Sequence, residues 1–269
     1  MSEPLLRVEK ITKNFRGLTA VLNVSFDVTA GQIKAMIGPN GAGKTTIFNL
    51  LCGFLPLSGG QVGFDGHSII GLPSHRVAER GLIRTFQNVR LFHHMTVLEN
   101  VAVGLHRQTR TGFWAGALDL PFAHREEVDV EAKSRAVLKF VGLEAEAQRH
   151  ASHLPFGQQR LLELGRAFAS SPRLLLLDEP AAGLNEQETA QLGELIRRMR
   201  EAGTTILLVE HDMHLVMGVA DEILVLNYGE KIAEGTPREI QNDPAVVVAY
   251  LGRARQTRTA ATHRQPVVA

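Results

Sequence analysis

The sequence has few cysteines and few aromatic residues, and neither sign of charge is in excess. Cys52 is the only cysteine among 269 residues, so an intrachain disulfide is excluded and a reducing compartment is compatible with the chain. The 29 Lys and Arg residues are balanced by 28 Asp and Glu residues. Nucleic-acid-binding proteins more often have a strongly basic face, so this balance predicts no nucleic-acid partner.

Long apolar runs are also missing. The longest runs, such as residues 174–177 and 206–209, are far shorter than the roughly 20 residues that a membrane-spanning helix needs. Residues 1–15 contain several charged side chains and no apolar stretch of a signal peptide. If the chain serves a membrane, we therefore expect it to act from the aqueous side.

Strand-like segments alternate with helical patterns along most of the chain, which predicts an α/β fold with a mainly parallel core sheet. Early and late hairpin patterns add an antiparallel β part, and the middle of the chain predicts a helical subdomain. The predicted strands are 6–8, 21–28, 33–37, 62–64, 174–177, 205–209, 223–226 and 231–233. The predicted helices are 44–52, 130–141 and 157–170, with further helices that begin at capping residues Thr96 and Asn185.

A phosphate-binding loop is the clearest motif. The run Gly38-Pro39-Asn40-Gly41-Ala42-Gly43-Lys44-Thr45 matches G-x-x-x-x-G-K-[ST] and lies between a predicted strand and a predicted helix. Glycines allow backbone N–H groups to surround a phosphate, Lys44 can neutralise the β/γ phosphates, and the Thr45 hydroxyl can bind Mg²⁺. A glycine-rich turn that matches by chance is the alternative, and the flanking strand and helix disfavour it. We therefore expect a nucleoside triphosphate with Mg²⁺.

Two carboxylates follow a buried strand pattern. Residues 174–177 are four leucines, and Asp178 and Glu179 come directly after them. Parallel α/β sheets bind ligands at the carboxyl ends of their strands. We expect Asp178 to hold Mg²⁺ through water and Glu179 to orient or deprotonate the attacking water. The alternative is an acidic loop that caps the following helix.

A histidine also ends a strand pattern. His211 follows the predicted strand 205–209, where it could bind a γ-phosphate or the attacking water. A surface histidine is the alternative, and its place at a strand end favours the functional interpretation.

Over residues 4–251 the chain resembles an ABC (ATP-binding cassette) ATPase. Several motifs occur in the family's order: the Walker A loop from Gly38 to Thr46, the Q-loop glutamine Gln87, the Walker B end at Asp178 and Glu179, and the switch histidine His211. The resemblance implies ATP contacts from these residues and Mg²⁺ ligation by Thr45, Gln87 and Asp178. It also places Phe15 where an aromatic residue stacks on adenine, with a core aromatic as the alternative. Residues 182–185 resemble the family's D-loop, and Asn185 stands there where the family usually has Asp.

The family signature Leu-Ser-Gly-Gly-Gln departs from its usual form. Here it is Leu154-Pro155-Phe156-Gly157-Gln158. In the family this segment starts a helix that meets the γ-phosphate of the opposite subunit. Pro155 removes a hydroxyl and an N–H donor, and Phe156 adds bulk, whereas Gly157, Gln158 and the helix dipole remain. We expect the composite site on the partner's phosphate loop to be weakened.

The aromatic-Gly-Gln-Gln variant resembles one ATPase subunit of branched-chain amino-acid importers. That resemblance implies three kinds of partner: a second, different ATPase subunit, two membrane permease subunits and, indirectly, a periplasmic binding protein. It also implies that the chain is a peripheral subunit on the cytoplasmic face of the membrane. Urea and amide importers share much of the pattern and stay an alternative. A soluble ABC protein is disfavoured because the sequence has no sustained heptad repeat, and a P-loop kinase would not need a signature helix or His211.

We expect four segments. Residues 1–86 form the first part of the nucleotide-binding core, with the antiparallel β part and Walker A. Residues 87–156 form the Q-loop and helical subdomain, and residues 157–251 form the second part of the core. Residues 252–269 contain four Arg and no acidic residue, which predicts a disordered tail.

Overall fold

The computed structural model describes residues 3–87, 89–105 and 121–249. The chain divides into two compact units, Met1–Gly71 with Val209–Ala269 and Leu72–Leu208, and each is considered by itself. The predicted tail 252–269 lies outside the described residues. None of the described helices is long and apolar enough to cross a membrane.

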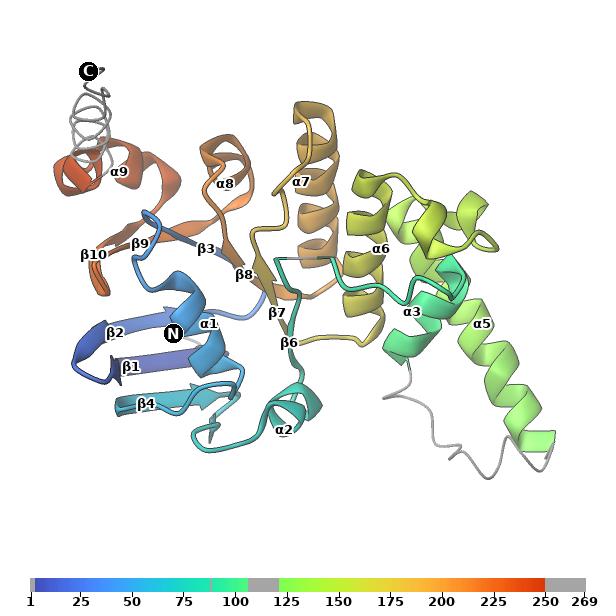
Figure 1. The fold of residues 1–269 in the computed structure, drawn as a ribbon, viewed down its shortest axis with the longest axis horizontal. Helices are drawn as coiled ribbons and strands as arrows, with labels where there is room; N and C mark the ends of the chain where they lie inside the picture. Colours follow the sequence, from blue (N-terminus) through green and yellow to red (C-terminus); the bar gives the residue numbers. More distant parts are fainter. Residues whose placement is uncertain (1–2, 88, 106–120, 250–269) are drawn as a thin grey trace, which may run out of the picture. The chain divides into compact units, whose positions relative to one another are not determined.

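The first unit contains an antiparallel sheet with the strand order β2-β1-β4-β5 (Figure 1). The strands are β1 (Leu6–Phe15), β2 (Leu18–Val28), β4 (Gly59–Phe64) and β5 (His67–Ser68). Leu6 of β1 pairs with Val28 of β2 and with Phe64 of β4. All three side chains are buried, so one face of this sheet belongs to the core.

The same unit holds part of the parallel core. β3 (Ile33–Ile37) pairs in parallel with β9 (Glu222–Asn227), and β10 (Glu230–Gly235) pairs with β9 in the antiparallel direction. The helices of this unit are α1 (Lys44–Leu51), α8 (Met213–Val219) and α9 (Pro237–Asn242). An apolar cluster joins β3 and β9 to α8 and α9. β3 is buried at all five positions. Four of them are apolar, and the buried Lys34 forms ion pairs with Glu222 and Glu234.

The second unit contains the strand order β8-β7-β6. Its strands are β6 (Leu82–Arg84), β7 (Leu174–Asp178) and β8 (Thr205–Val209). Its α-helices among the described residues are α2 (Ser74–Glu79), α3 (Val97–Leu105), α5 (Pro121–Val141), α6 (Phe156–Ala169) and α7 (Glu186–Glu201). Two short 3-10 helices span Glu144–Glu146 and Ala151–His153.

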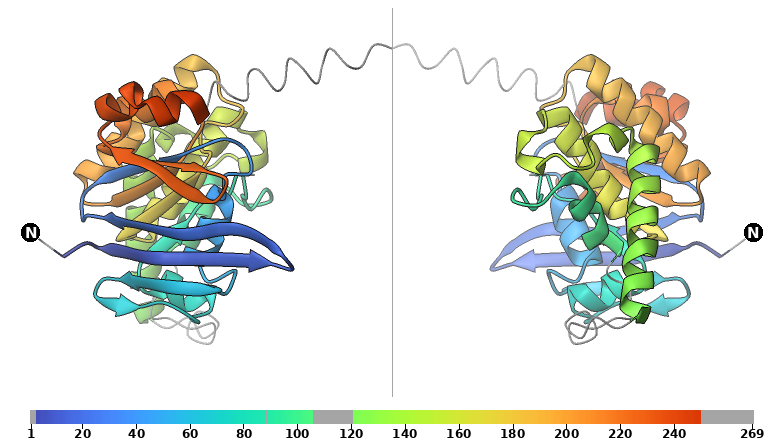
Figure 2. Two further views of the ribbon diagram at one scale, coloured as in Figure 1. Left: turned by 90° about the vertical axis from the view of Figure 1, so that its left-hand side faces the viewer. Right: turned by 90° about the vertical axis from the view of Figure 1, so that its right-hand side faces the viewer.

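Helices α3, α5 and α6 pack together (Figure 2). Phe140 of α5 stacks on Phe168 of α6 with ring centroids 4.8 Å apart. Gly104 of α3 lies against α6, and a Cβ added to it would overlap the carbonyl oxygen of Arg166. The backbone approach therefore requires glycine at position 104.

Most predicted elements are confirmed, and several of their boundaries differ from the prediction. Both predicted caps form: the Thr96 and Glu99 side chains bind each other's backbone N–H, and Asn185 and Glu188 do the same at α7. The helix predicted to begin at Val130 begins at Pro121. Proline is accepted in the first turn of a helix because the N–H there lacks an intrahelical partner, so Pro121 can begin α5. Strands β1 and β2 are also longer than predicted.

Gly104→Ala tests the close approach of α3 to α6. Helix propensity alone would favour alanine by about 1 kcal/mol, but the added Cβ overlaps backbone atoms. We expect the free energy of unfolding to fall by about 1–3 kcal/mol, measured by urea denaturation followed by circular dichroism. Gly63→Ala is the control because a Cβ there meets no atom within 4 Å. A more stable Gly104→Ala protein would contradict this packing.

Candidate nucleotide-binding site

The predicted phosphate loop joins β3 to α1 in the first unit. Gly38, Gly41 and Gly43 have φ angles of 151°, 81° and 101°, in the region that favours glycine. A Cβ on Gly38 would overlap the carbonyl oxygen of Leu226, and one on Gly43 would lie 2.8 Å from the oxygen of Ala20. The loop therefore needs glycine for its backbone conformation and for its close packing against neighbouring strands.

The Lys44 side chain folds back over this loop. It is only 6% exposed, and its Nζ donates to the carbonyl oxygens of Gly38 at 2.6 Å and Pro39 at 3.3 Å. Helix α1 begins after Gly43 without a side-chain cap, and Thr45 at its first turn is exposed. A buried ammonium, a glycine cradle and an uncapped helix N-terminus together fit a bound phosphate group.

The carboxylate pair lies in the second unit at the end of β7. Asp178 is 4% exposed, and its Oδ2 forms a 2.7 Å ion pair with a guanidinium nitrogen of Arg84 on β6. Glu179 follows with a φ of 48°, and its Oε2 accepts a 2.8 Å hydrogen bond from Nε2 of Gln87. The structure therefore brings three predicted residues together, Gln87, Asp178 and Glu179.

Arg84 is a residue that the sequence reasoning missed. Its place three residues before Gln87 was visible, but its ion pair with Asp178 depends on the parallel pairing of β6 with β7. The ion pair fixes one oxygen of the Asp178 carboxylate.

His211 lies just after β8, in the first unit, and is exposed. The preceding residue Glu210 is 1% exposed, and its carboxylate accepts from the backbone N–H of His211 at 2.9 Å and of Asp212 at 3.3 Å. Asp212 in turn caps α8 by accepting from the N–H of Leu215. Glu210, whose role the sequence reasoning missed, thus fixes the backbone that carries His211.

The altered signature packs against α7 and the D-loop turn. Pro155 is the N-cap of α6, and a Cβ on Gly157 would overlap the Glu188 carboxylate. Phe156 is 46% exposed, and a Cβ on Gly183 would lie 3.0 Å from its ring. The bulk of Phe156 is therefore accommodated beside glycine in the D-loop.

Two further predicted positions have clear environments. Asn185 accepts from the N–H of Glu188 at 2.9 Å, so Asn performs the capping role that Asp would perform. Gln158 has a buried Oε1 with no hydrogen-bond partner among the described residues.

Phe15 ends β1 and is 40% exposed, with Nζ of Lys13 5.0 Å from its ring centroid. The core alternative for Phe15 is therefore wrong, because a core aromatic residue would be buried. Adenine stacking by Phe15 stays a prediction.

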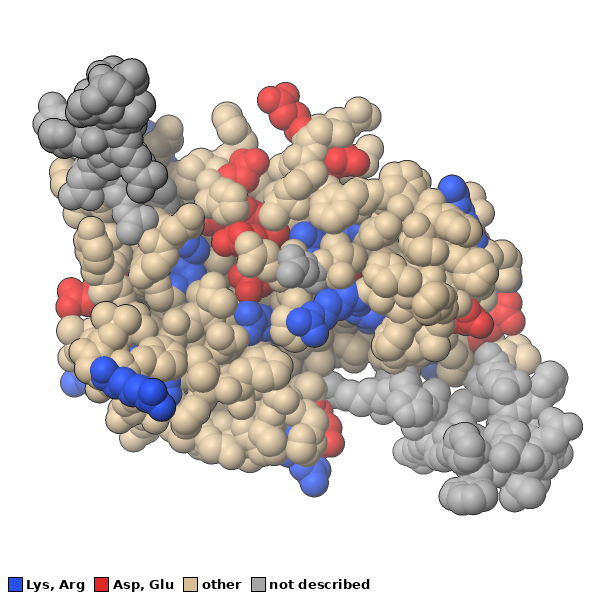
Figure 3. Space-filling model, in the orientation of Figure 1, with Lys and Arg blue, Asp and Glu red and all other residues tan. Residues whose placement is uncertain are grey.

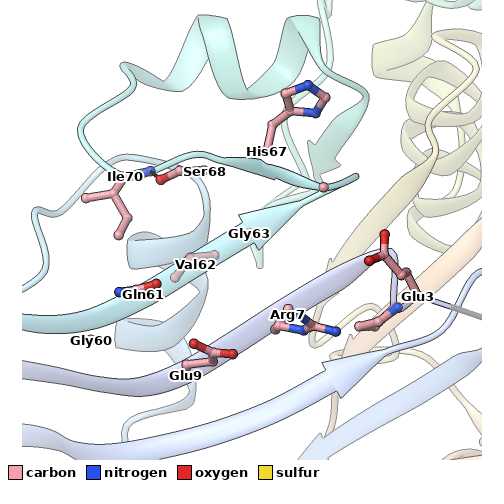
Figure 4. Close-up of a pocket in the computed structure, with 12 residues that line it drawn as sticks. Glu3, Arg7, Glu9, Gly60, Gln61, Val62, Gly63, His67, Ser68 and Ile70 are labelled. Carbon is pink, nitrogen blue, oxygen red and sulfur yellow. Dashed lines mark hydrogen bonds between the residues drawn. The ribbon is translucent and has the colours of Figure 1, made fainter.

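A cavity of about 860 Å³ lies on the antiparallel sheet of the first unit (Figure 4). Arg7 and Glu9 of β1 and Gln61 of β4 are among its lining residues. None of the predicted nucleotide-binding residues lines this cavity. It is therefore distinct from the predicted phosphate loop.

Comparison with known proteins agrees with the motifs. The family model described as ABC transporter matches residues 21–182, and that of the branched-chain amino acid ATP-binding cassette transporter matches residues 230–255. The high-affinity branched-chain amino acid transport ATP-binding protein LivG of Salmonella typhimurium is 48% identical over 94% of this chain and 100% of its own length. The corresponding BraF protein of Pseudomonas aeruginosa is 49% identical over the same shares.

Solved structures give the same result. The ADP conformation of an ATP-binding cassette of an ABC transporter has a TM-score of 0.81 and 32% identity, and covers 93% of this chain and 100% of its own. A nucleotide-free ATP-binding cassette has a TM-score of 0.79 and 32% identity, with 92% and 99% covered. The glycine cradle around Lys44, the paired carboxylates after β7 and these likenesses all agree. The chain belongs to the ABC transporter family, whose ATP-binding subunits hydrolyse ATP to drive transport.

Proposed function

We propose that this chain is the ATP-hydrolysing subunit of an importer for branched-chain amino acids. ATP hydrolysis is supported by the arrangement after β7, where Gln87 donates a hydrogen bond to Glu179 beside the buried Asp178. The amino-acid class is supported by the names of LivG and BraF and by the C-terminal family match at residues 230–255. An importer of urea or other amides is the alternative, and uptake assays with both substrate classes would distinguish the two.

In this proposal ATP and Mg²⁺ are held by residues of the named motifs. Lys44, Thr46 and the N–H groups around Gly43 bind phosphate, and Phe15 stacks on adenine. Thr45, Gln87 and Asp178 bind Mg²⁺, which neutralises phosphate charge when bound.

The reaction itself depends on Glu179 and His211. Glu179 orients the attacking water and accepts its proton, and Gln87 fixes the carboxylate through the Nε2–Oε2 hydrogen bond. His211 binds the γ-phosphate or that water, on a backbone fixed by the buried Glu210. This division assigns proton transfer to one group and phosphate sensing to another.

The membrane permease subunits are proposed to dock on the second unit. A hollow of about 760 Å³ there is lined by apolar side chains after β6, by α3 and by α6, among them Phe86, Leu91, Phe92 and Val103. Figure 3 shows basic side chains, in blue, gathered over the part of this unit where β6 and α6 lie in Figure 1. An apolar hollow with a basic rim suits a short amphipathic segment of a partner. This surface would place the chain at the cytoplasmic face of the membrane as a peripheral subunit.

The second ATPase subunit is proposed to be a different chain. Pro155 and Phe156 alter the signature that Gly157 and Gln158 complete, so a homodimer would place the alteration opposite both nucleotides. In a heterodimer only one site carries it, and a periplasmic binding protein would deliver substrate to the permeases without touching this chain. Co-purification with the products of neighbouring genes would test this assembly.

Lys44→Ala should leave the chain folded but weaken Mg-ATP binding by about tenfold to hundredfold, because a buried ammonium that binds phosphate is lost. Isothermal titration with Mg-ATP measures this change. Lys133→Ala is the control, since Lys133 forms an exposed ion pair with Asp129 on α5. Unchanged affinity in folded Lys44→Ala protein would remove the phosphate-loop assignment.

Glu179→Gln should bind ATP normally but lower the rate of hydrolysis by about 10²–10⁴-fold, because an amide cannot accept the proton of water. Phosphate release from the assembled transporter measures the rate, and ATP-bound dimer should accumulate. Glu186→Gln, at an exposed position of α7, is the control. The matching change in the second ATPase subunit should have a smaller effect, and equal effects would argue against unequal sites.

Val103→Asp should reduce substrate uptake about tenfold or more while basal ATP hydrolysis stays near that of the unmodified protein, because a buried charge weakens an apolar interface. Uptake and phosphate release are measured together in proteoliposomes. Val128→Asp is the control, since Val128 is exposed on α5 and does not line the hollow. Equal loss of both activities would mean that the hollow serves the ATP site.

A further inference from the structure

Three side chains of α6 reach the segment that carries Gln87. Arg160, Glu163 and Arg166 are spaced by three residues, so they lie along one side of the helix. Each binds the backbone of residues 86–90. The same helix begins at Phe156 with the altered signature. Helix α6 therefore carries the signature and also contacts the Q-loop.

Arg160 makes the most contacts. It is 2% exposed, and its guanidinium donates to the carbonyl oxygens of Gln87 at 2.9 Å and Phe86 at 3.3 Å. The same group forms a 3.0 Å ion pair with Glu163. A planar guanidinium can donate hydrogen bonds to these three acceptors at once, because its N–H groups form a rigid fork. The compact ammonium of lysine lacks this fork.

Glu163 and Arg166 fasten the other end of the segment. One oxygen of Glu163 accepts from the backbone N–H of Arg90 at 3.1 Å, and Arg166 donates to the carbonyl oxygen of Arg90. Burial raises the pKa of Glu163, while the Arg90 N–H and the Arg160 guanidinium oppose that shift. The backbone is therefore held at Gln87 and again at Arg90.

These contacts continue to the reacting end of β7. The Gln87 backbone is held by Arg160, and its side chain donates to Glu179 at 2.8 Å. We propose that Arg160, paired with Glu163, is a positioning residue that sets the Glu179 carboxylate through Gln87. The proposal rests on the roles proposed above for Gln87 and Glu179.

The experiment is a double-mutant cycle on the full-length chain in its assembled transporter. Arg160→Lys keeps the charge but removes the fork, and we expect kcat to fall about tenfold or more with KM for ATP within about twofold, as expected when a reacting group is misplaced but substrate binding is kept. Gln87→Ala should also lower kcat. In the Gln87→Ala background, Arg160→Lys should cause no further fall, because its effect passes through Gln87.

Two other variants complete the series. Arg197→Lys is the matched control, because Arg197 forms an exposed ion pair with Glu194 on α7. Glu163→Gln keeps the hydrogen-bond acceptor but removes the charge, and we expect a smaller fall in kcat that Gln87→Ala also abolishes. This variant provides the test if Arg160→Lys does not fold.

The outcomes separate this inference from the proposed function. If Gln87→Ala lowers kcat but folded Arg160→Lys does not, the positioning role is wrong and the site assignment stands. Additive losses in the cycle would show that the effect of Arg160→Lys does not pass through Gln87. A parallel loss of kcat and ATP affinity would show that Arg160 supports the site as a whole and does not position Glu179. Either result would overturn the inference. If Gln87→Ala leaves kcat unchanged, the role of Gln87 is wrong and the positioning inference fails with it.

Discussion

The carboxylates at the end of β7 need polar partners, because the strand that carries them is fully buried. The four leucines before Asp178 are 0% exposed, and Asp178 itself is buried. An ionised group in such a place is costly unless it is paired. Arg84 on β6 supplies the partner of Asp178, and Gln87 supplies that of Glu179. The chemistry of the site therefore depends on the pairing of β6 with β7.

The same requirement extends outward through α6. Gln87 can hold Glu179 only if its own backbone is fixed, and the buried guanidinium of Arg160 fixes it. Glu163 prevents Arg160 from being an uncompensated buried charge. In the first unit a different constraint applies, since close packing at Gly38 shapes the loop that holds Lys44. One part of the machinery thus relies on charge pairing and the other on the absence of side chains.

The altered signature also has a physical explanation in the fold. Phe156 lies against Gly183 of the D-loop turn, and Gly157 lies against the Glu188 carboxylate. The aromatic ring is accepted because its neighbour has no side chain. Asn185 similarly replaces Asp without losing the cap of α7. These departures from the family pattern are therefore compatible with a well-packed second unit.

The sequence by itself determined the family, the α/β fold class and the motif residues, because these depend on short-range patterns. The phosphate loop and the capping boxes are local in the chain, and the buried strand β7 begins with four consecutive leucines. Helix α5 was predicted to start too late, because Pro121 is ambiguous between a helix breaker and a first-turn residue. Tertiary structure alone decided the partners of Asp178 and Glu179 and the contacts of Arg160 with residues 86 and 87, since these join residues more than 70 positions apart. No local pattern encodes which strands become neighbours, and that choice selects the partner of each buried charge.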